Sequence, residues 1–367
     1  MNIFVALVAF ALICLIYGKL LEKRGLKGLA CSRRFSKSAV FEGEQAELIE
    51  VISNDRPLFI PWLRVESRVT RHIQMGSRAA APDEQSVPHQ SLFTLMPFQR
   101  VTRRHQVTFL HRGEFDIGSA SLTVGDITGM FQCSRDQRLS APVRVYPRLL
   151  DDDEIPSPLS RLIGEATAQR QLLRDPFLIQ SIRPWLPGDS ARDIHWPATA
   201  RTGEVQVRVH DWSAQLRLMI ILNSQLRENQ WGDLMEYEQE IIEREISLAA
   251  TLCVRALRQG CTVGFAANMP MDDSREGAVL MPSGGLPREE ALLTAFAKLK
   301  VLRTFRFPAF LDTLDQLTGL NIIVLSPYDS DEIRLRLNRL RRQGNTVEMV
   351  VLETQTEEAS RRGDASA

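Results

Sequence analysis

The stretch Leu216-Arg217-Leu218-Met219-Ile220-Ile221-Leu222 decides the fold of the second half of this chain. Only Arg217 interrupts the apolar run, and such a run is typical of a strand that is buried on both faces of a parallel sheet. Segments with helical periodicity and short apolar segments alternate after it. This order predicts a doubly wound α/β domain over residues 175–353.

The elements expected beyond this strand carry the ordinary signals of helix and strand. Helices show apolar residues at three- and four-residue spacing and end near glycine, whereas the strands are short runs rich in branched residues. We expect helices at 233–259, 288–301, 309–317 and 332–342, and strands at 261–267, 321–326 and 347–352. Residues 354–367 are polar and lack periodicity, so a disordered tail is expected there.

Closely spaced turn signals precede the apolar strand. Pro187-Gly188 is typical of a turn, and Asp189 stands where it is expected to cap a short helical turn. Pro197 suits the first position of a second short helix, which Gly203 is expected to end. After it, valines alternate with polar residues up to position 210, which predicts a half-buried strand.

The same segment concentrates opposed charges around Trp185 and Trp196. Such a mixture predicts an internal ion-pair network, a protein-docking surface, or both, and the sequence leaves these alternatives open. The residues that we expect to carry this structural or partner-binding role are Trp185, Pro187, Gly188, Asp189, Arg192, Trp196, Arg201 and Gly203.

Residues 185–203 resemble the signature of the bacterial family known as domain of unknown function 58. In that signature Tyr or Trp, then x-P-G-D, is followed by R-x-I-x-W and A-R-T-G. The stretches F-E-G-E at 41–44, H-R-G-E-F-D-I-G at 111–118, G-D-I-T-G-M-F at 125–131 and V-Y-P-R at 145–148 are also similar to family counterparts. The resemblance therefore covers about residues 40–330.

The resemblance implies that the α/β domain is similar to von Willebrand factor type A domains. Metal-binding versions end their first strand in D-x-S-x-S, where this chain has Asn223, Gln225 and Arg227. Divalent cations such as magnesium require hard oxygen ligands, usually with carboxylate charge. We therefore expect a degenerate loop without a metal ion, and no cofactor.

An apolar run, 3–17, lies near the start of the chain, and basic residues follow it. We expect residues 1–18 to form a transmembrane helix, followed by a basic juxtamembrane segment at 19–34. A secretory signal peptide would carry its basic residues before the run. The positive-inside rule predicts that the soluble domains are cytoplasmic. A helix lying in the membrane interface is the alternative.

Between the apolar run and the α/β domain, alternating segments separated by turn residues predict a β-sandwich over residues 35–148. Within it, 74–89 is rich in small residues, proline and glutamine and is expected to be a loop. The acidic stretch 151–158 carries prolines, and residues 149–174 are expected to be a linker and arm.

Catalytic and ligand-binding motifs give little support for an enzyme. Phosphate-binding glycine loops, the G-x-S-x-G elbow and H-E-x-x-H do not occur in the sequence. His105 and His111 are six residues apart and are expected to share a face, but the sequence shows no third ligand for zinc. His195 is expected to be structural.

Composition excludes a global attraction to nucleic acid, because 45 basic residues balance 45 acidic ones. The expected function is that of a membrane-anchored cytoplasmic scaffold or adaptor, without enzymatic activity. The resemblance implies a MoxR-type AAA+ ATPase as partner, and a transglutaminase-like membrane protein as a second one. The alternatives are a hydrolase built on Asp189, Asp193 and His195, and an extracytoplasmic binding module.

Overall fold

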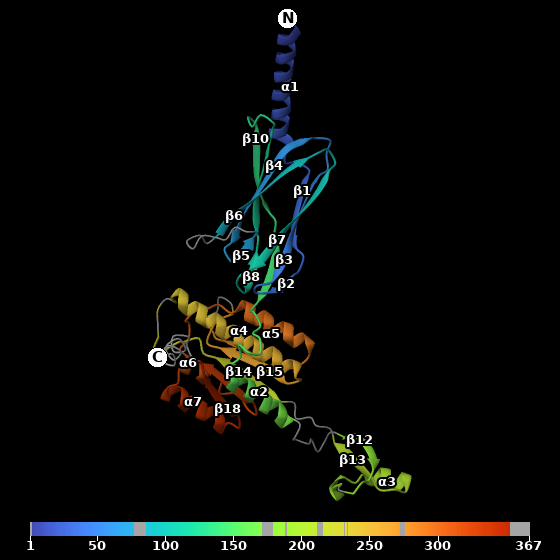
Figure 1. Ribbon diagram of the computed structural model, residues 1–367, viewed down its shortest axis with the longest axis vertical. Helices are drawn as coiled ribbons and strands as arrows, with labels where there is room; N and C mark the ends of the chain where they lie inside the picture. The colour runs from blue at the N-terminus through green and yellow to red at the C-terminus, as the bar shows by residue number, and fades with distance from the viewer. Residues whose placement is uncertain are drawn as a thin grey trace, which may run out of the picture. The chain divides into compact units, whose positions relative to one another are not determined.

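A computed structural model describes residues 2–76, 86–170, 179–187, 189–210, 216–230, 232, 234–271 and 276–352. The chain divides into two compact units, Met1–Arg148 and Leu149–Ala367 (Figure 1). The first unit contains a long helix and a β-sandwich, and the second contains the α/β domain. The expected combination of α/β and all-β architecture is confirmed at this level.

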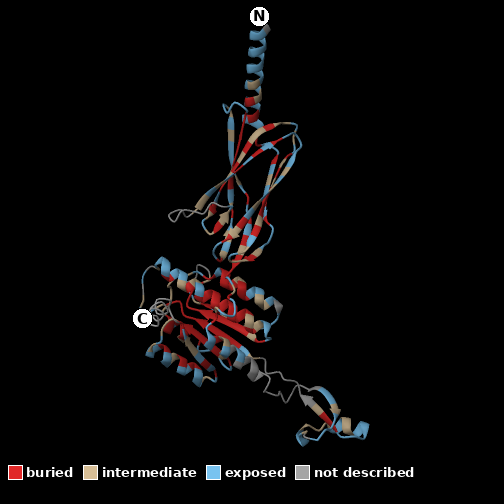
Figure 2. Ribbon diagram, in the orientation of Figure 1, coloured by how far each residue is buried: buried red, intermediate tan, exposed pale blue. Residues whose placement is uncertain are grey.

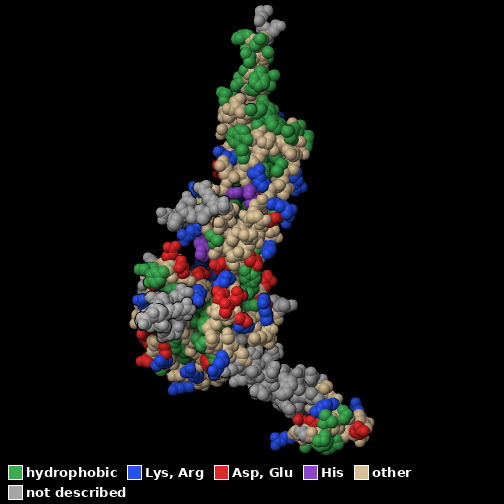
Figure 3. All heavy atoms as spheres, viewed as in Figure 1, with side chains coloured by type: hydrophobic (Ala, Val, Ile, Leu, Met, Phe, Trp, Pro, Cys, Tyr) green, Lys and Arg blue, Asp and Glu red, His purple; other side chains and the backbone are tan. Residues whose placement is uncertain are grey.

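Helix α1, Asn2–Arg24, is longer than expected. At 1.5 Å per residue its 23 residues extend about 35 Å, and it is long and apolar enough to cross a membrane. Hydrophobic side chains coat it in Figure 3. The helix continues beyond the predicted boundary at residue 18, through Gly18 itself, and ends before Gly25. Leu21, on the last turns, is buried in the core of the sandwich.

The sandwich consists of two four-stranded sheets and a smaller three-stranded one. Their orders are β1-β3-β7-β5, β10-β9-β4-β6 and β2-β11-β8. The first two sheets share one apolar cluster, which joins Ile52 of one to Leu63 and Leu122 of the other. The strands are β1 (Leu29–Phe35), β2 (Ala39–Phe41), β3 (Gln45–Asn54), β4 (Ile60–Thr70), β5 (Ile73–Met75), β6 (Ser86–Leu95), β7 (Arg100–Phe109), β8 (Gly113–Asp116), β9 (Ser119–Gly125), β10 (Gln132–Arg138) and β11 (Pro142–Tyr146).

Two expectations about this unit are corrected. The sandwich begins at Leu29 and not at residue 35, because β1 pairs with β3 from Leu29↔Asn54 onward. The supposed juxtamembrane segment therefore contributes a strand, and its Arg33 is buried. Strands β5 and β6 occupy the two ends of the loop that was expected at 74–89. Residues 77–85, between these strands, lie outside the described part of the chain.

The α/β domain is built on a five-stranded sheet of order β16-β15-β14-β17-β18. Strands β14 (Arg217–Leu222), β15 (Thr262–Ala267), β17 (Asn321–Ser326) and β18 (Thr346–Val351) run parallel, and β16 (Ala278–Ser283) is an antiparallel edge that was not predicted. Leu218 and Ile220 of β14 alternate with Met219 and Ile221 between two separate apolar clusters. The expectation that this strand is buried on both faces is confirmed (Figure 2).

Helices cover both faces of the sheet. Helices α4 (Glu236–Arg258) and α5 (Leu286–Lys298) contribute to the cluster that contains Leu218, and α6 (Phe307–Asp312) and α7 (Asp331–Arg342) to the one that contains Met219. All four helices were predicted, with shifted ends.

The region expected to be a linker and arm begins inside the core of the α/β domain and continues as a helix, while residues 171–174 lie outside the described part of the chain. Leu150 and Leu159 join the apolar cluster that α4 and α5 form. Leu159 lies on α2, Ser157–Arg170, and the backbone amide of Leu150 donates to Thr251 Oγ1 of α4 at 2.9 Å. The second unit therefore begins at Leu149. The tail expected at 354–367 lies outside the described residues.

Candidate functional site

The segment with the turn signals folds as a two-stranded hairpin, which we call the signature hairpin (residues 179–187 and 189–210). Strand β12, Ile179–Pro184, pairs antiparallel with β13, Gln206–His210. A one-turn 3-10 helix η1, Ala191–Asp193, and the short helix α3, Trp196–Thr202, lie between the strands. Gly188 and Asp211, which belong to the sequence pattern, lie outside the described residues.

Asp189 closes the turn after β12. Its two carboxylate oxygens accept hydrogen bonds from both terminal nitrogens of Arg183, each at 2.7 Å, and one of them also accepts from the Leu186 amide at 2.8 Å. The expected helix cap is therefore wrong, because the carboxylate is engaged by the strand and turn. Ser190 caps η1 instead, accepting from the Arg192 amide. The hydrogen bonds that Arg183 donates to Asp189 raise the pKa of the guanidinium above its usual value.

Helix α3 has the predicted beginning and end. Pro197 lies in its first turn, and Gly203 ends it with a φ of 73°, a left-handed conformation that favours glycine. His195 caps the helix, because its Nδ1 accepts from the Ala198 amide at 3.0 Å. Thr199 Oγ1 also accepts from the Gln206 amide, which fastens the helix to β13. His195 is therefore structural in this geometry.

The hydrogen-bonded frame leaves large apolar side chains in solvent. Trp196 is 67% exposed, Leu186 56% and Trp185 43%, and Ile182 and Val205 are exposed to a similar degree. Tryptophan in this state offers a large contact area with an N–H donor at its edge, which is typical of binding surfaces.

Two of the arginines predicted for this segment lie on the same hairpin. Arg192 and Arg201 are exposed, and within the described residues neither guanidinium makes an ion pair or a hydrogen bond. Arg183 thus serves the frame of the hairpin, whereas these two project into solvent. The charged residues of this segment therefore differ in their surroundings, since Arg183 is bonded within the hairpin and the other two are exposed.

The loop after β14 is closed by amides and hydroxyls. Asn223 donates to Ser326 Oγ at 2.9 Å and accepts from the Gln225 amide, while Gln225 Oε1 accepts from the Phe307 amide at 2.7 Å. Asn223, Gln225 and Ser326 are buried, and Arg227 is exposed. These side chains therefore hydrogen-bond one another and their neighbouring backbone, and so close the loop after β14.

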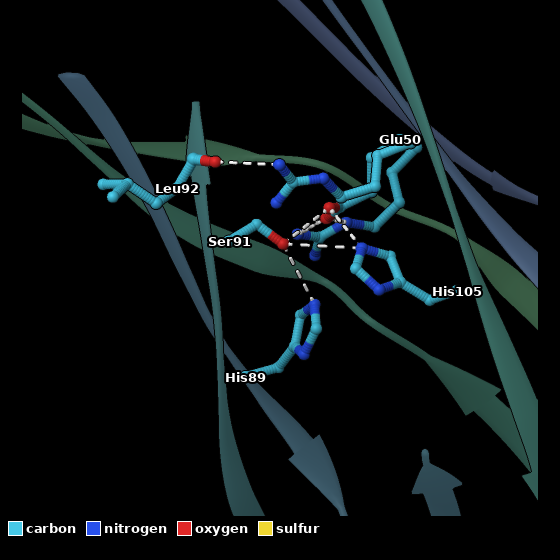
Figure 4. A network of polar contacts seen from close by, with 7 residues as sticks. Glu50, His89, Ser91, Leu92 and His105 are labelled. Atoms are coloured by element: carbon cyan, nitrogen blue, oxygen red, sulfur yellow. Dashed lines mark hydrogen bonds and ion pairs between the residues drawn. The ribbon is translucent and has the colours of Figure 1, made fainter. Parts of the chain in front are cut away.

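A second polar cluster, which was not predicted from the sequence, lies inside the sandwich (Figure 4). Glu50 on β3 accepts from Arg33 through Oε1, at 2.9 Å and 2.6 Å. Its Oε2 lies 3.1 Å from His105 Nε2 on β7 and 3.0 Å from Ser91 Oγ on β6. Ser91 Oγ also lies 3.3 Å from His89 Nε2. These side chains come from both sheets of the sandwich.

Two opposing effects act on the ionisation of Glu50. Burial disfavours the charged carboxylate, whereas its hydrogen bonds and the charge of Arg33 favour it. Burial would raise the pKa of the Glu50 carboxyl, but the hydrogen bonds from His105 and Arg33 and the positive charge of Arg33 lower it to about 2. Burial also lowers the pKa of His89. Glu50 is therefore an ionised carboxylate in the interior, next to two histidines.

His105 and His111 belong to two different histidine pairs. His105 packs edge-on against His89, and His111 packs in the same way against His72, with ring centroids 4.8 Å apart in both pairs. The strand pairing that brings them together is not visible from spacing. One signal was present: Glu50 occupies an inward position between Leu48 and Ile52, where an alternating strand normally carries an apolar residue.

Residues 181–282 match the model of a family described as "Protein of unknown function DUF58". The uncharacterized protein YeaD of Bacillus subtilis (strain 168) is 19% identical over 254 residues, which are 69% of this chain. The chain spans 59% of the length of that relative.

Two solved structures are similar over about a third of this chain. The CARDB domain of a Pyrococcus furiosus protein, in complex with di-metal ions, is 13% identical, with 33% of this chain and 96% of that chain covered and a TM-score of 0.21. A protein of unknown function from Porphyromonas gingivalis W83 is 10% identical, with 35% and 51% covered and a TM-score of 0.22. Likenesses of this size carry no argument about fold or function.

Proposed function

We propose that this chain, which belongs to the DUF58 family through residues 181–282, is a membrane-anchored adaptor whose signature hairpin docks a protein partner. The observation that carries the proposal is the exposure of Trp185, Leu186 and Trp196 on a hydrogen-bonded frame. A surface held rigid before binding loses less conformational entropy when the partner arrives.

The charge on the hairpin indicates the chemistry of the partner surface. Arg192 and Arg201 accompany the tryptophans, and arginine with tryptophan is the combination most enriched at the energetic centre of protein interfaces. A partner that fits these residues offers apolar pockets bordered by carboxylates. The family resemblance names a MoxR-type AAA+ ATPase as that partner, and a transglutaminase-like membrane protein as a further member of the assembly.

The α/β domain has the role of a scaffold in this proposal. A central parallel sheet with one antiparallel edge strand and helices on both faces is compatible with a von Willebrand factor type A-like domain. Hydrogen bonds of Asn223 and Gln225 close the loop after β14, at the positions where metal-binding versions of the domain have metal ligands. Adhesion through a shared metal is therefore not part of the proposed mechanism.

Helix α1 supplies the anchor in the proposed topology. Its apolar part precedes the basic residues Lys19, Lys23 and Arg24. If these basic side chains stay on the cytoplasmic side, as the positive-inside rule expects, both units lie in the cytoplasm. A reporter that is fluorescent only when it folds in the cytoplasm, fused after residue 367, is expected to label the membrane. Activity of a periplasmic phosphatase at the same position would contradict this orientation.

Two other functions have less support from the geometry. A hydrolase would need Asp189 and His195 available for proton transfer, but Arg183 holds the carboxylate and the Ala198 amide donates to His195 Nδ1. An extracytoplasmic binding module would require the reverse orientation of α1.

Binding to the ATPase tests the proposal directly. The MoxR-type ATPase from the same organism is co-expressed with the full chain, and the complex is isolated from detergent-solubilised membranes. Trp196→Ala is expected to weaken capture of the ATPase by at least about tenfold, the effect of losing a central interface residue. Leu335→Ala on α7 is the matched control, since Leu335 is 66% exposed and Trp196 67%. Equal loss or equal retention in both variants would contradict the assignment.

A further inference from the structure

We propose that Glu50, His89 and His105 form a binding site for a divalent transition metal, zinc in the first place, inside the β-sandwich. Within the described residues these three side chains bring one ligand atom each to within 4.8 Å of the others. Two imidazoles and one carboxylate are a donor set that zinc and other first-row metals accept. The site is separate from the signature hairpin and from the loop after β14.

The distances near those of a tetrahedral site are the one between Glu50 and His105 and those that run through Ser91, while the three proposed ligand atoms all lie within 4.8 Å of one another. Zinc bonds nitrogen and oxygen at about 2.0–2.1 Å, which places its ligand atoms about 3.4 Å apart. Glu50 Oε2 lies 3.1 Å from His105 Nε2 and 3.0 Å from Ser91 Oγ. Ser91 Oγ in turn lies 3.3 Å from His89 Nε2 and 3.5 Å from His105 Nε2. The ion would occupy the space enclosed by these atoms, with Ser91 or a water as fourth ligand.

The surroundings hold the carboxylate in a position to bind. Arg33 hydrogen-bonds only Oε1 of Glu50, so Oε2 remains directed at His105 and Ser91 (Figure 4). Hydrogen bonds of this kind, outside the ligands themselves, orient metal-binding carboxylates and contribute to affinity. Arg33 forms an ion pair with the Glu50 carboxylate. Glu50 is 2% exposed.

The site includes residues of an edge strand and two histidines that are not fully buried. His89 and Ser91 lie on β6, which is the last strand in the order β10-β9-β4-β6. Both histidines are only partly buried. The apolar clusters on either side, one containing Ile52 and the other Leu48, limit the polar space to this layer of the sandwich.

The chain supplies its own control for the test. His72 and His111 form a second pair with the same centroid distance of 4.8 Å and the same interplanar angle of 87° as His89 and His105. That pair is not part of a group with a third ligand among the described residues. Binding that requires only two neighbouring histidines would therefore be the same at both pairs.

Full-length protein in detergent, treated with chelator and then freed of it, is titrated with zinc by calorimetry and with cobalt(II) by visible absorption. We expect one equivalent of cobalt with the intense bands of tetrahedral coordination, displaced by zinc. His89→Ala and His105→Ala are expected to weaken binding by at least about 100-fold, whereas His111→Ala is expected to leave it unchanged. The variant at His89 keeps the Arg33–Glu50 pair, and its thermal unfolding shows whether it remains folded. Absence of saturable binding to the unmodified chain, or equal binding by the His89 and His111 variants, would overturn the proposal.

Discussion

Arg183 holds Asp189 by two parallel hydrogen bonds of 2.7 Å, and this pair defines the turn from which Trp185 and Leu186 project. The pair belongs to the frame of the signature hairpin, while the side chains between its members face solvent. The two residues of the pair therefore flank a run of exposed residues, 184–187.

Asp189→Asn is expected to loosen the turn without unfolding the α/β domain. The amide oxygen keeps one acceptor but loses the charge that Arg183 binds through two nitrogens. Hydrogen exchange at the Leu186 amide, which donates to Asp189 at 2.8 Å, should accelerate. Glu204→Gln, an exposed change in the same hairpin, should leave this exchange unaltered. Unchanged exchange in the Asp189 variant would show that the pair does not hold the turn.

Gly18→Leu is expected to destabilise the junction between α1 and the sandwich. A Cβ at this position would stand 2.2 Å from Phe131 Cδ2, so the ring or the helix must move. Overpacking of this kind costs about 1–3 kcal/mol. Thermal unfolding in detergent measures the loss, and Phe131→Ala in the same chain should restore part of it. Equal melting temperatures of Gly18→Leu and the unmodified chain would contradict the docking of the helix.

Glu245 predicts a pH dependence of the stability of the α/β domain. It is buried on α4, its Oε2 has no hydrogen-bond partner among the described residues, and burial raises its pKa to about 8. The folded state then holds a proton that the unfolded state releases near its ordinary pKa, so the free energy of unfolding falls as pH rises from about 4.5 to about 8.

Glu245→Gln should flatten this dependence and raise the melting temperature most at pH 8, because the neutral amide needs no proton. Glu240→Gln, at an exposed position of the same helix, serves as control. A decline in stability from pH 5 to 8 that is equally steep in both variants would exclude Glu245 as its origin.

Asn223→Asp tests the closure after β14. Asn223 is fully buried and donates to Ser326 Oγ at 2.9 Å, and an aspartate would bring a charge without a donor. The expected loss is about 1–3 kcal/mol of unfolding free energy, measured by denaturant titration. Asn229→Asp should instead be tolerated, since exposed Asn229 already accepts from Arg306 at 2.6 Å. Once bound metal and then the chelator have been removed, the melting temperature of the unmodified chain should be the same with and without magnesium, and a saturable stabilisation by magnesium would reveal a site for that ion.

The parts of the fold that the sequence predicts are those with local causes. The run 216–222 identifies a strand buried on both faces, and Pro197 with Gly203 marks both ends of α3 because each acts on its own backbone. The end of α1 is missed, because the residues after Gly18 are good helix formers and the helix continues through them to Arg24. The edge strand β16 is missed because it is short and contains a proline.

The polar layer of the sandwich depends on contacts that no local pattern records. Glu50 and Ser91 are 41 residues apart and meet only because two sheets pack face to face. Likewise, the signature hairpin contains a hydrogen-bonded arginine and two exposed ones, because only Arg183 of these three bonds Asp189. The sequence identifies the composition of each site, and the pairing of strands decides which members come together.

Photo-crosslinking in cells tests the central claim most directly. A photoreactive amino acid is placed at residue 196 or at the equally exposed residue 335 of the full, membrane-anchored chain. Irradiation at residue 196 should give one adduct of the size of this chain plus the MoxR-type ATPase, and Arg192→Glu with Arg201→Glu should abolish it while the melting temperature hardly moves. Residue 335 should give no such adduct. No ATPase adduct at residue 196, or the same adduct at both positions, would contradict docking through the signature hairpin.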